Sequence, residues 1–577
     1  MSGSSSTVSS AVARAIAARA DDVFGVMGNG NAHVLDALTR TTARFTAVRH
    51  EAGGVVAADA YARASGRIAV ATTTYGPGFA NALTPLAEAA HARIPLVLLT
   101  GAAPTTGPRG WDLDQHALAL ALGVPTVTVD AATPQRRALE AFDRAVRERI
   151  PVVLAIPYDL ATATAGDEEP VPPDAPLAPP PLDEAANAGL RRAAAVLAAA
   201  ERPHLLAGRG AWLAGAGAEL NRLAAALGAT TSSTALGRGL FADAAHDLGV
   251  TGGFGDPAAM DAIHDADAVL VVGASLSPFT TRFGRLFGPA AHVIRIDLAD
   301  ASSDERVDVH IRADARVAAE ALTELVRAGS PDARVVPRHP EADPEPDPEH
   351  AADGRLHPRA LAERLATLLP EDRIVVTDGG HFIGWPNTAW PVASPERMIM
   401  VGTAIQTIGV GFPSLVGATR ARPDTTIVLA AGDGGSLMAL ADLETAVRVA
   451  GGRGMAVVFN DAAYGAEVHA YADRGVAEAA TRIPEADFAA LATASGAHGV
   501  VVRDLADLEP LRTWTSMPPA ERPFLLLDCR ISPLVVAPFW HEVVAQGAGQ
   551  STGAPVRGAK NAASSSVASS GSTADTY

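Results

Sequence analysis

The chain has 577 residues and a formal net charge of −18. Its length allows several buried cores, so we expect three domains, and an acidic balance without a basic stripe argues against nucleic acid as a partner. The only lysine is Lys560 and the only cysteine is Cys529. These counts exclude a Schiff-base lysine in the folded part, intrachain disulfides, multi-cysteine zinc sites and iron–sulfur clusters. Electrophilic catalysis must therefore come mainly from a bound cofactor or a metal.

The first ten residues, M-S-G-S-S-S-T-V-S-S, lack a basic region followed by an apolar core, so we expect no signal peptide. No apolar run approaches the roughly 18–20 residues that a membrane-spanning helix needs. We therefore expect a cytoplasmic protein without a membrane partner.

Residues 1–161 alternate short apolar strands with Ala-rich helices, which predicts a doubly wound parallel sheet. Glu51 lies where one strand ends, and Gly66 is the expected stop of the helix that follows. The predicted elements are a strand over 45–50, a helix over 52–65, a strand over 68–73, a turn over 75–78, a helix ending at 91 and a strand over 95–100.

Residues 188–330 show the same alternation of strands and helices. Two glycines in Gly208-Arg209-Gly210, together with Gly273, could cradle a phosphate, although a lone Gly-x-Gly is weak evidence. Asp297 follows a strand and suits either a ribose hydroxyl or an ordinary turn. The acidic, Pro-rich stretches 162–187 and 329–358 are expected to be extended linkers on either side of this segment.

Residues 356–545 contain the most informative stretch, which runs from Gly432 to Gly465. A buried strand over 426–431 is followed by a Gly-rich turn bearing Asp433, a helix, a second strand over 455–459 and the pair Asn460-Asp461. A right-handed crossover places the two strand ends side by side. Oxygen ligands above Gly-rich backbone suit Mg²⁺ that bridges to a diphosphate. The tail over 546–577 is rich in Ser, Ala, Gly and Thr and is predicted to be disordered.

The G-D-G-G-S to N-D stretch resembles the diphosphate-binding motif of thiamine diphosphate (ThDP) enzymes. The series R-H-E-A-G-G, Y-G-P-G-F-A-N and I-P-L-V-L-L-T-G is similar to the pyrimidine-binding domain of the acetolactate synthase-like group, and the resemblance covers residues 10–545. It implies an α/β protein with a pyrimidine-binding domain (1–161) and a diphosphate-binding domain (356–545). Both would contain doubly wound parallel sheets and flank a dinucleotide-like middle domain (188–330). The implied cofactors are ThDP and Mg²⁺; FAD, which some relatives hold in the middle domain, is a weaker alternative.

The resemblance assigns Glu51 as the acid that protonates N1′ of the ThDP aminopyrimidine. Its apolar neighbours Val48, Val55 and Val56 would favour the protonated form; the alternative is a helix-start Glu favoured by the helix dipole. Ile408 maps to the wedge between the cofactor rings, and the Gln406 region maps to the backbone carbonyl that receives the amine. The full implied cofactor set is Glu51, Gly28, Gly76, Asn81, Gly380, His381, Gln406, Ile408, Gly432, Asp433, Gly434, Gly435, Ser436 and Asp461.

For the metal, the resemblance favours the side chains of Asp433 and Asp461 with the Ala463 carbonyl. The connection before the second strand looks one residue long, so Asn460 is kept as an alternative ligand to Asp461. In this family the catalytic Glu and the diphosphate site come from different subunits, which implies at least a homodimer.

Substrate residues are less clearly indicated. Gln115 matches a glutamine that acetolactate synthases carry near the cofactor, and His116 beside it is a candidate proton donor. Asp114 and Ala470 stand where those synthases commonly carry aromatic residues, which puts pyruvate as the substrate in doubt. The leading hypothesis is decarboxylation of a 2-oxo acid with transfer of the acyl anion to a carbonyl acceptor. The alternatives are a decarboxylase or C–C lyase that acts on a bulkier substrate, and a non-catalytic ThDP-binding assembly subunit.

Overall fold

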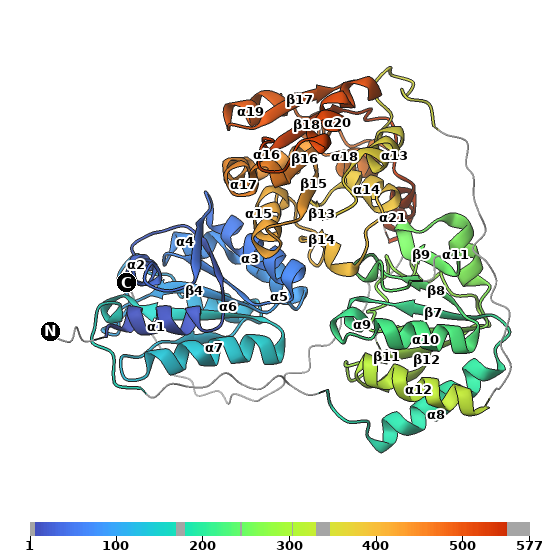
Figure 1. Cartoon of the computed structure of the whole chain (residues 1–577), viewed down its shortest axis with the longest axis horizontal. Coiled ribbons are helices and arrows are strands. Elements are labelled where there is room, and N and C mark those ends of the chain that lie inside the picture. Colours follow the sequence, from blue (N-terminus) through green and yellow to red (C-terminus); the bar gives the residue numbers. More distant parts are fainter. Residues whose placement is uncertain (1–5, 169–178, 243–244, 303, 330–346, 551–577) are drawn as a thin grey trace, which may run out of the picture.

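The computed structural model describes residues 6–168, 179–242, 245–302, 304–329 and 347–550. Three six-stranded parallel sheets, each covered by helices, form three α/β domains (Figure 1). The predicted fold class is confirmed. The sheets span residues 22–157, 203–312 and 373–530.

The N-terminal sheet has the order β2-β1-β3-β4-β6-β5. Its strands are β1 (Asp22–Gly25), β2 (Arg44–Ala47), β3 (Ala69–Thr73), β4 (Leu96–Ala102), β5 (Thr126–Thr128) and β6 (Pro151–Pro157). Its helices are α1 (Val8–Ala17), α2 (Ala32–Leu38), α3 (Glu51–Ser65), α4 (Pro77–Asn81), α5 (Leu83–His91), α6 (Gln115–Ala121) and α7 (Pro134–Glu148). The predicted stop at Gly66 is confirmed: this residue caps α3 with φ 71°. The predicted helix ending at 91 is instead two helices, α4 and α5.

The C-terminal sheet has the order β14-β13-β15-β16-β18-β17, so its strands follow one another in space as those of the N-terminal sheet do. Its strands are β13 (Arg373–Thr377), β14 (Met398–Met400), β15 (Thr426–Gly432), β16 (Gly454–Asn460), β17 (His498–Val502) and β18 (Leu525–Arg530). Its helices are α13 (Pro358–Leu368), α14 (Gly384–Ala389), α15 (Gly411–Ala421), α16 (Asp433–Met438), α17 (Leu443–Ala450), α18 (Gly465–Tyr471), α19 (Phe488–Ala494), α20 (Glu509–Ser516) and α21 (Pro538–Gln550).

The middle sheet, β12-β11-β10-β7-β8-β9, has the strand order of dinucleotide-binding folds. Its strands are β7 (Pro203–Ala207), β8 (Thr230–Ser233), β9 (Asp247–Val250), β10 (Ala268–Val272), β11 (His292–Asp297) and β12 (Val307–Arg312). Its helices are α8 (Glu184–Ala199), α9 (Arg209–Leu213), α10 (Gly217–Leu227), α11 (Pro257–His264) and α12 (Ala315–Gly329).

Two predicted boundaries are corrected. Helix α8 begins at Glu184, inside the stretch predicted to be a linker, because Asp183 caps it by accepting the Ala186 N–H. Helix α21 continues to Gln550, so residues 546–550 of the predicted tail are helical. Residues 169–178 and 330–346 of the two Pro-rich stretches, and residues 551–577 of that tail, lie outside the described residues.

Helices α3 and α15 join the two similar domains. A Cβ placed on Gly417 would lie 2.0 Å from the Ala57 carbonyl oxygen, so the two backbones nearly touch. Both helices are buried along most of their length because each lies between its own sheet and the other domain. This packing fixes the start of α3, at Glu51, relative to the segment that precedes α15.

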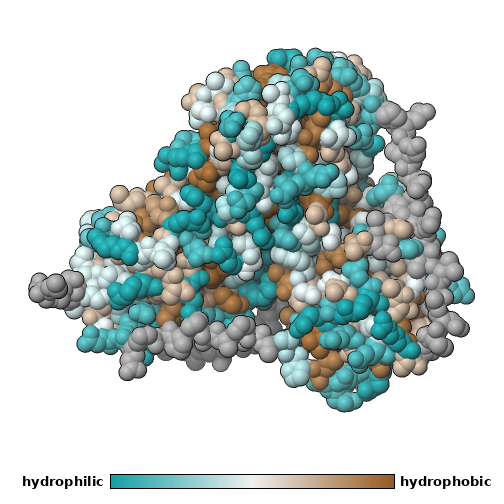
Figure 2. Space-filling view, viewed as in Figure 1, coloured by the Kyte–Doolittle hydropathy of each residue, from teal (hydrophilic) through white to brown (hydrophobic). Residues whose placement is uncertain are grey.

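The visible molecular surface intersperses hydrophilic and hydrophobic residues (Figure 2). Within the described ranges, no helix combines the length and the apolar character that crossing a membrane requires.

Candidate functional site

Glu51 is the first residue of α3 and lies beside α4. Its Oε2 accepts a hydrogen bond of 3.0 Å from Asn81 Nδ2. Gly78 leaves room for the carboxylate, since a Cβ there would lie 3.2 Å from Glu51 Oε1. His50 caps the helix by accepting the Ala52 N–H at Nδ1. The structure thus brings together two residues of the predicted site, Glu51 and Asn81.

Gln115 fastens the turn that bears Gly76 to strand β4. Its Oε1 accepts the Gly76 N–H at 2.7 Å, and its Nε2 donates to the Gly101 carbonyl at 2.9 Å. Gly76 has φ 64°, a conformation that glycine adopts without strain. The Gln115 amide is therefore engaged by backbone on both sides, whereas His116 is exposed on α6.

Gly28 lies close to the same turn. Its N–H donates to Asn31 Oδ1 at 2.8 Å, and a Cβ on it would meet Thr74 Cβ at 2.7 Å. Gly28, Gly76 and Gln115 therefore gather near the carboxyl ends of β1, β3 and β4, where ligands bind in parallel α/β sheets.

Asp433 and Asp461 form a close pair of carboxyl groups in the C-terminal domain, in which Asp433 is buried and Asp461 is partly buried. Asp433 begins α16, and its Oδ2 accepts the Ala463 N–H at 3.2 Å. Burial and the neighbouring Asp461 charge raise the pKa of Asp433, and burial raises the pKa of Asp461. A divalent cation between the two side chains would remove the repulsion and supply the charge that the buried oxygens lack. The pair therefore fits the predicted Mg²⁺.

Asn460 lies away from that pair. It is the last residue of β16, and its Nδ2 donates to Asp528 Oδ1 at 2.8 Å and to the Ala486 carbonyl at 3.0 Å. Of the two residues left open by the sequence, Asp461 is thus the one that contacts Asp433.

Ser436 supplies a further sign of a missing ligand. Its hydroxyl oxygen is buried in α16, three residues after Asp433, and has no hydrogen-bond partner among the described residues. A buried hydroxyl is normally hydrogen-bonded. A phosphate oxygen at this position would satisfy it, which fits the predicted diphosphate.

Asp378 is a functional candidate that the sequence reasoning missed. Its buried carboxylate accepts the backbone N–H groups of Gly379, Gly409, Val410 and Gly411 at 2.7–3.3 Å. Burial raises the pKa of Asp378 to about 6. The carboxylate joins the 379–381 loop to the segment around Ile408. The signal was the Asp that ends the strand I-V-V-T-D.

Gln406 has φ 61°, a left-handed conformation that costs a residue with a side chain roughly 1–2 kcal/mol. It directly precedes Thr407 and the predicted wedge, Ile408, whose Cγ2 lies 3.0 Å from where a Cβ on Gly379 would be. A strained residue two positions before the predicted wedge is typical of a segment shaped for a ligand.

The predicted glycines around this segment also leave no room for side chains. A Cβ on Gly432 would meet the Phe382 ring, one on Gly434 would meet the Tyr464 ring and one on Gly435 would meet Asp378 Oδ2, all within 3.0 Å. Gly380 has φ 134°. These close approaches bring the segments at 378–382 and 432–435 and the residue Tyr464 together in the C-terminal domain.

His381 is buried beneath helix α21. Its Nε2 accepts the Ala537 N–H at 2.8 Å, so the ring proton is on Nδ1. Burial, with His469 and His541 nearby, lowers the pKa of His381 to about 3. The His469 ring centroid lies 4.5 Å away, and the Phe539 and Trp540 rings of α21 also contact His381. His381 is therefore neutral at physiological pH.

Helix α21 also reaches the middle domain. The Phe539 ring lies 5.2 Å from Phe254 and 6.0 Å from Phe279, and Glu542 Oε1 accepts from Arg282 Nε at 2.8 Å. One helix thus contacts both the middle domain and His381.

A cavity of about 300 Å³ separates the start of α3 from the segment before α15. His50, Asn81, Ile408, Met438 and Asp442 are among its lining residues. Glu51, Asp433 and Asp461 do not line it.

The glycines of the middle domain pack against one another. A Cβ on Gly208 or on Gly273 would lie 2.3–2.4 Å from backbone atoms of the facing loop. Arg209 turns away and donates to the Ala92 carbonyl at 2.9 Å. Asp297 accepts the Ala299 N–H at 2.9 Å and pairs with Arg295. Packing and turn formation account for these residues.

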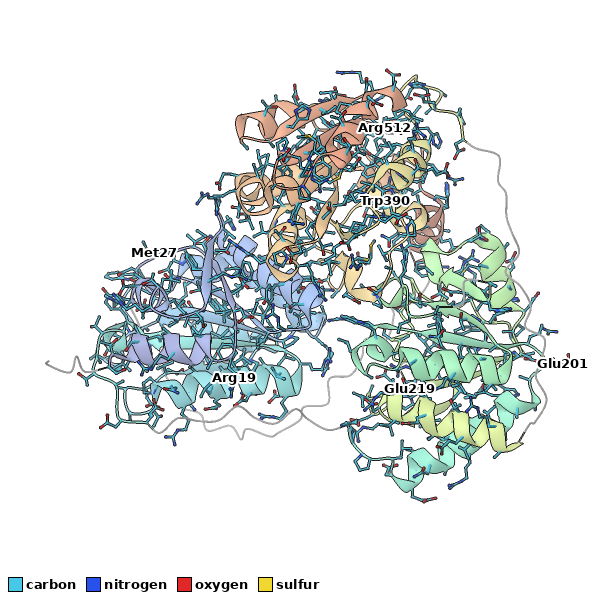
Figure 3. The ribbon with its side chains drawn as sticks, viewed as in Figure 1. Arg19, Met27, Glu201, Glu219, Trp390 and Arg512 are labelled. Carbon is cyan, nitrogen blue, oxygen red and sulfur yellow. The ribbon has the colours of Figure 1, made fainter. Side chains whose placement is uncertain are left out.

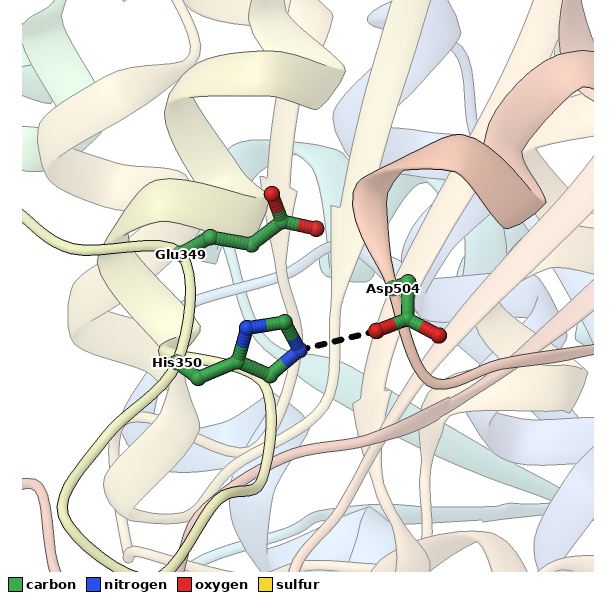
Figure 4. A group of neighbouring side chains, drawn as sticks. All are labelled: Glu349, His350 and Asp504. Atoms are coloured by element: carbon green, nitrogen blue, oxygen red, sulfur yellow. Dashed lines mark hydrogen bonds and ion pairs between the residues drawn. The ribbon is translucent and has the colours of Figure 1, made fainter.

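A separate group of Glu349, His350 and Asp504 lies at the edge of the C-terminal domain (Figure 4). His350 Nε2 is 2.9 Å from Asp504 Oδ1, and Glu349 accepts the Leu505 N–H at 2.7 Å. Glu349 and Asp504 are exposed. These contacts fasten the 349–350 segment to the turn at 505 and have no connection with the predicted cofactor residues.

Comparison with known proteins agrees with this arrangement. Three family models match: the thiamine pyrophosphate enzyme N-terminal TPP binding domain over residues 6–120, the central domain over 190–325 and the C-terminal TPP binding domain over 378–525. A sulfoacetaldehyde acetyltransferase from Castellaniella defragrans is 30% identical in an alignment of 536 positions that covers 85% of this chain and 87% of the relative.

Acetolactate synthases are similar over a smaller share. The isozyme 2 large subunit from Escherichia coli (strain K12) is 32% identical over 436 residues, covering 74% of this chain and 78% of the relative. A probable acetolactate synthase large subunit from Methanocaldococcus jannaschii is 30% identical, covering 73% and 75%. With all three domains matched in order, the chain belongs to the ThDP-dependent enzymes of the acetolactate synthase-like family.

Proposed function

We propose that this enzyme uses ThDP and Mg²⁺ to decarboxylate a 2-oxo acid and to transfer the acyl group to a carbonyl acceptor. The observation that carries the proposal is the pair of Asp433 and Asp461 together with the buried Ser436 hydroxyl, which has no hydrogen-bond partner within the part of the chain that the structure describes. Two facing carboxylates and a buried hydroxyl suit a Mg²⁺–diphosphate. The carboxylates would bind the cation, and the hydroxyl would donate a hydrogen bond to a phosphate oxygen.

Each segment of the predicted cofactor site has a role in this proposal. Asp433, Asp461 and the Ala463 carbonyl would hold Mg²⁺. Ile408 would separate the two cofactor rings, and Glu51 would hold a proton at N1′ of the aminopyrimidine. Bound ThDP supplies the nucleophilic carbon and the electron sink for decarboxylation.

The separation of the two parts of the site supports a homodimer. Among the described residues, no hydrogen bond or ion pair joins Glu51 to Asp433 or Asp461, and the cavity between the domains is lined by none of the three. Met27, on the rim of the N-terminal domain (Figure 3), is 64% exposed and Trp111 is 68% exposed. A partner subunit that covers this rim would bury both and bring its diphosphate site to Glu51.

The decisive experiment is product analysis by NMR with ThDP, Mg²⁺ and pyruvate. The wild type is compared with Glu51→Gln and with Glu140→Gln, a control on the surface of α7. Formation of acetolactate by the wild type and the control, with strong loss in Glu51→Gln, supports the proposal. Acetaldehyde as the product would identify a decarboxylase, and ThDP binding without turnover of any 2-oxo acid would identify an assembly subunit.

A second candidate substrate is suggested by the extent of similarity. The relative named sulfoacetaldehyde acetyltransferase matches 85% of this chain, against 74% for the synthase from E. coli. Sulfoacetaldehyde therefore belongs in the same assay, and acetyl-group transfer in its presence, without acetolactate, would replace the leading proposal.

The cytoplasm remains the predicted location.

A further inference from the structure

We propose that Glu88 and Asp442 are positioning residues, and that each fixes the catalytic segment of the other ThDP-binding domain. Glu88 belongs to the N-terminal domain and binds the chain just before Gln406 and Ile408. Asp442 belongs to the C-terminal domain and binds the chain just before Glu51. The inference rests on the proposed function, because it concerns the segments that would hold ThDP.

Glu88 is fully buried on α5 and accepts four hydrogen bonds from backbone of the other domain. Gly402 and Ala404 donate to Oε1 at 3.0 and 3.1 Å, and Ala404 and Ile405 donate to Oε2 at 3.0 and 2.9 Å. The Gly402 carbonyl in turn accepts the Thr407 N–H at 2.9 Å. Residues 402–407 are thus held as one turn that ends at the predicted wedge.

A buried arginine supports this carboxylate. Arg63 Nη2 lies 3.6 Å from Glu88 Oε1, and Arg63 Nη1 donates to the Met400 carbonyl at 3.1 Å. Asp59 completes the group by pairing with Arg63. Two side chains of the N-terminal domain therefore bind this segment: Glu88 binds N–H groups of the turn, and Arg63, held by Asp59, binds the Met400 carbonyl just before it. The position of the turn thus depends on the neighbouring domain.

Asp442 makes the corresponding contact in the opposite direction. It is buried, and its Oδ1 accepts the Arg49 N–H at 2.8 Å and the Thr445 hydroxyl at 3.1 Å. Gly53 lies against it so closely that a Cβ would be 2.1 Å from Oδ2. Asp442 thus binds the chain before Glu51 and packs closely against the chain after it.

The two contacts correspond because the two sheets share one strand order. Glu88 lies on the helix α5 that follows β3, and Asp442 directly precedes the helix α17 that follows β15. Strands β3 and β15 are each the third strand of their domain. Glu88 binds the segment before α15, the helix that follows β14. Asp442 binds the segment before α3, the helix that follows β2. Helices α3 and α15 already hold the domains together, so the two carboxylates act on the position of these segments.

The test uses the full-length chain with Glu88→Gln and Asp442→Asn. Glu168→Gln is the matched control, because Glu168 also accepts two backbone N–H groups, from Gln135 and Arg136 at 2.8 and 2.9 Å, away from the cofactor segments. Hydrogen exchange of the apoprotein reads the segments directly. We expect roughly tenfold faster exchange over 402–405 in Glu88→Gln, and at Arg49 in Asp442→Asn, since each variant weakens charge-assisted hydrogen bonds.

ThDP titration and kinetics separate the two roles. Glu88→Gln should raise the Kd for ThDP with Mg²⁺ about tenfold, because the ring-separating segment loses its anchor. Asp442→Asn should lower kcat roughly 10–100-fold while Kd changes less than about twofold, because a small displacement of Glu51 affects proton transfer more than affinity. Glu168→Gln should match the wild type in both readouts.

Unchanged exchange over 402–405 in Glu88→Gln, or a ThDP affinity equal to that of the control, would overturn the inference while the proposed function stands. A wild type that fails to bind ThDP would overturn both. Should Glu88→Gln not fold, Asp442→Asn decides: loss of kcat with retained Kd and faster exchange at Arg49 supports the inference, and wild-type kinetics overturn it.

Discussion

Replacing Asp378 with Asn tests the buried carboxylate that joins the cofactor loops. Burial raises the pKa of Asp378 from 3.8 to about 6. At 1.36 kcal/mol per pH unit, this shift corresponds to about 3 kcal/mol of folding free energy. The folded state binds the proton more tightly than the unfolded chain does. The stability that Asp378 contributes is therefore fully present below pH 3.8 and is lost as the pH rises through about 6.

The Asp378→Asn variant has no proton to lose at this position. We expect the free energy of unfolding of the wild type, relative to the variant, to fall by about 3 kcal/mol between pH 3.8 and pH 7. Urea unfolding of the apoprotein, followed by tryptophan fluorescence, measures it, since Trp385, Trp390, Trp514 and Trp540 all lie in the C-terminal domain. A difference that does not change with pH, or that grows in favour of the wild type, would refute the reasoning.

Three further changes test separate features. Gly417→Ala should lower the free energy of unfolding by about 1–2 kcal/mol, because overpacking against Ala57 outweighs the gain in helix propensity. The control Gly217→Ala, where a Cβ has room, should leave the free energy of urea unfolding unchanged. The same loss of stability in both variants would contradict the packing argument. Gln406→Gly should raise the unfolding free energy by about 0.5–1 kcal/mol by relieving the positive φ, without changing ThDP affinity in a titration; a loss of stability would count against strain. Asp461→Asn should weaken Mg²⁺ roughly 10–100-fold in a metal titration of activity, and an unchanged titration would remove Asp461 as a ligand.

Local patterns made much of the fold predictable. The apolar strands before Glu51 and Asp433 are followed by turn and helix signals that depend only on neighbouring residues, and the Gly66 stop is of the same kind, although the first strand ends at Ala47 and not at the predicted residue 50. Asp378 was not recognised because its partners at 409–411 are close only in the folded chain. The choice between Asn460 and Asp461 depended on where β16 ends, and strand ends are weakly encoded.

Helix α21 connects the middle domain with the surroundings of His381. Phe254 and Phe279 touch Phe539, and Phe539 lies beside Trp540 and His381. Repacking of the middle domain at these two phenylalanines would therefore reshape the aromatic surroundings of His381, a predicted ThDP contact. The cofactor site can thus be altered through a domain that supplies none of the predicted catalytic groups.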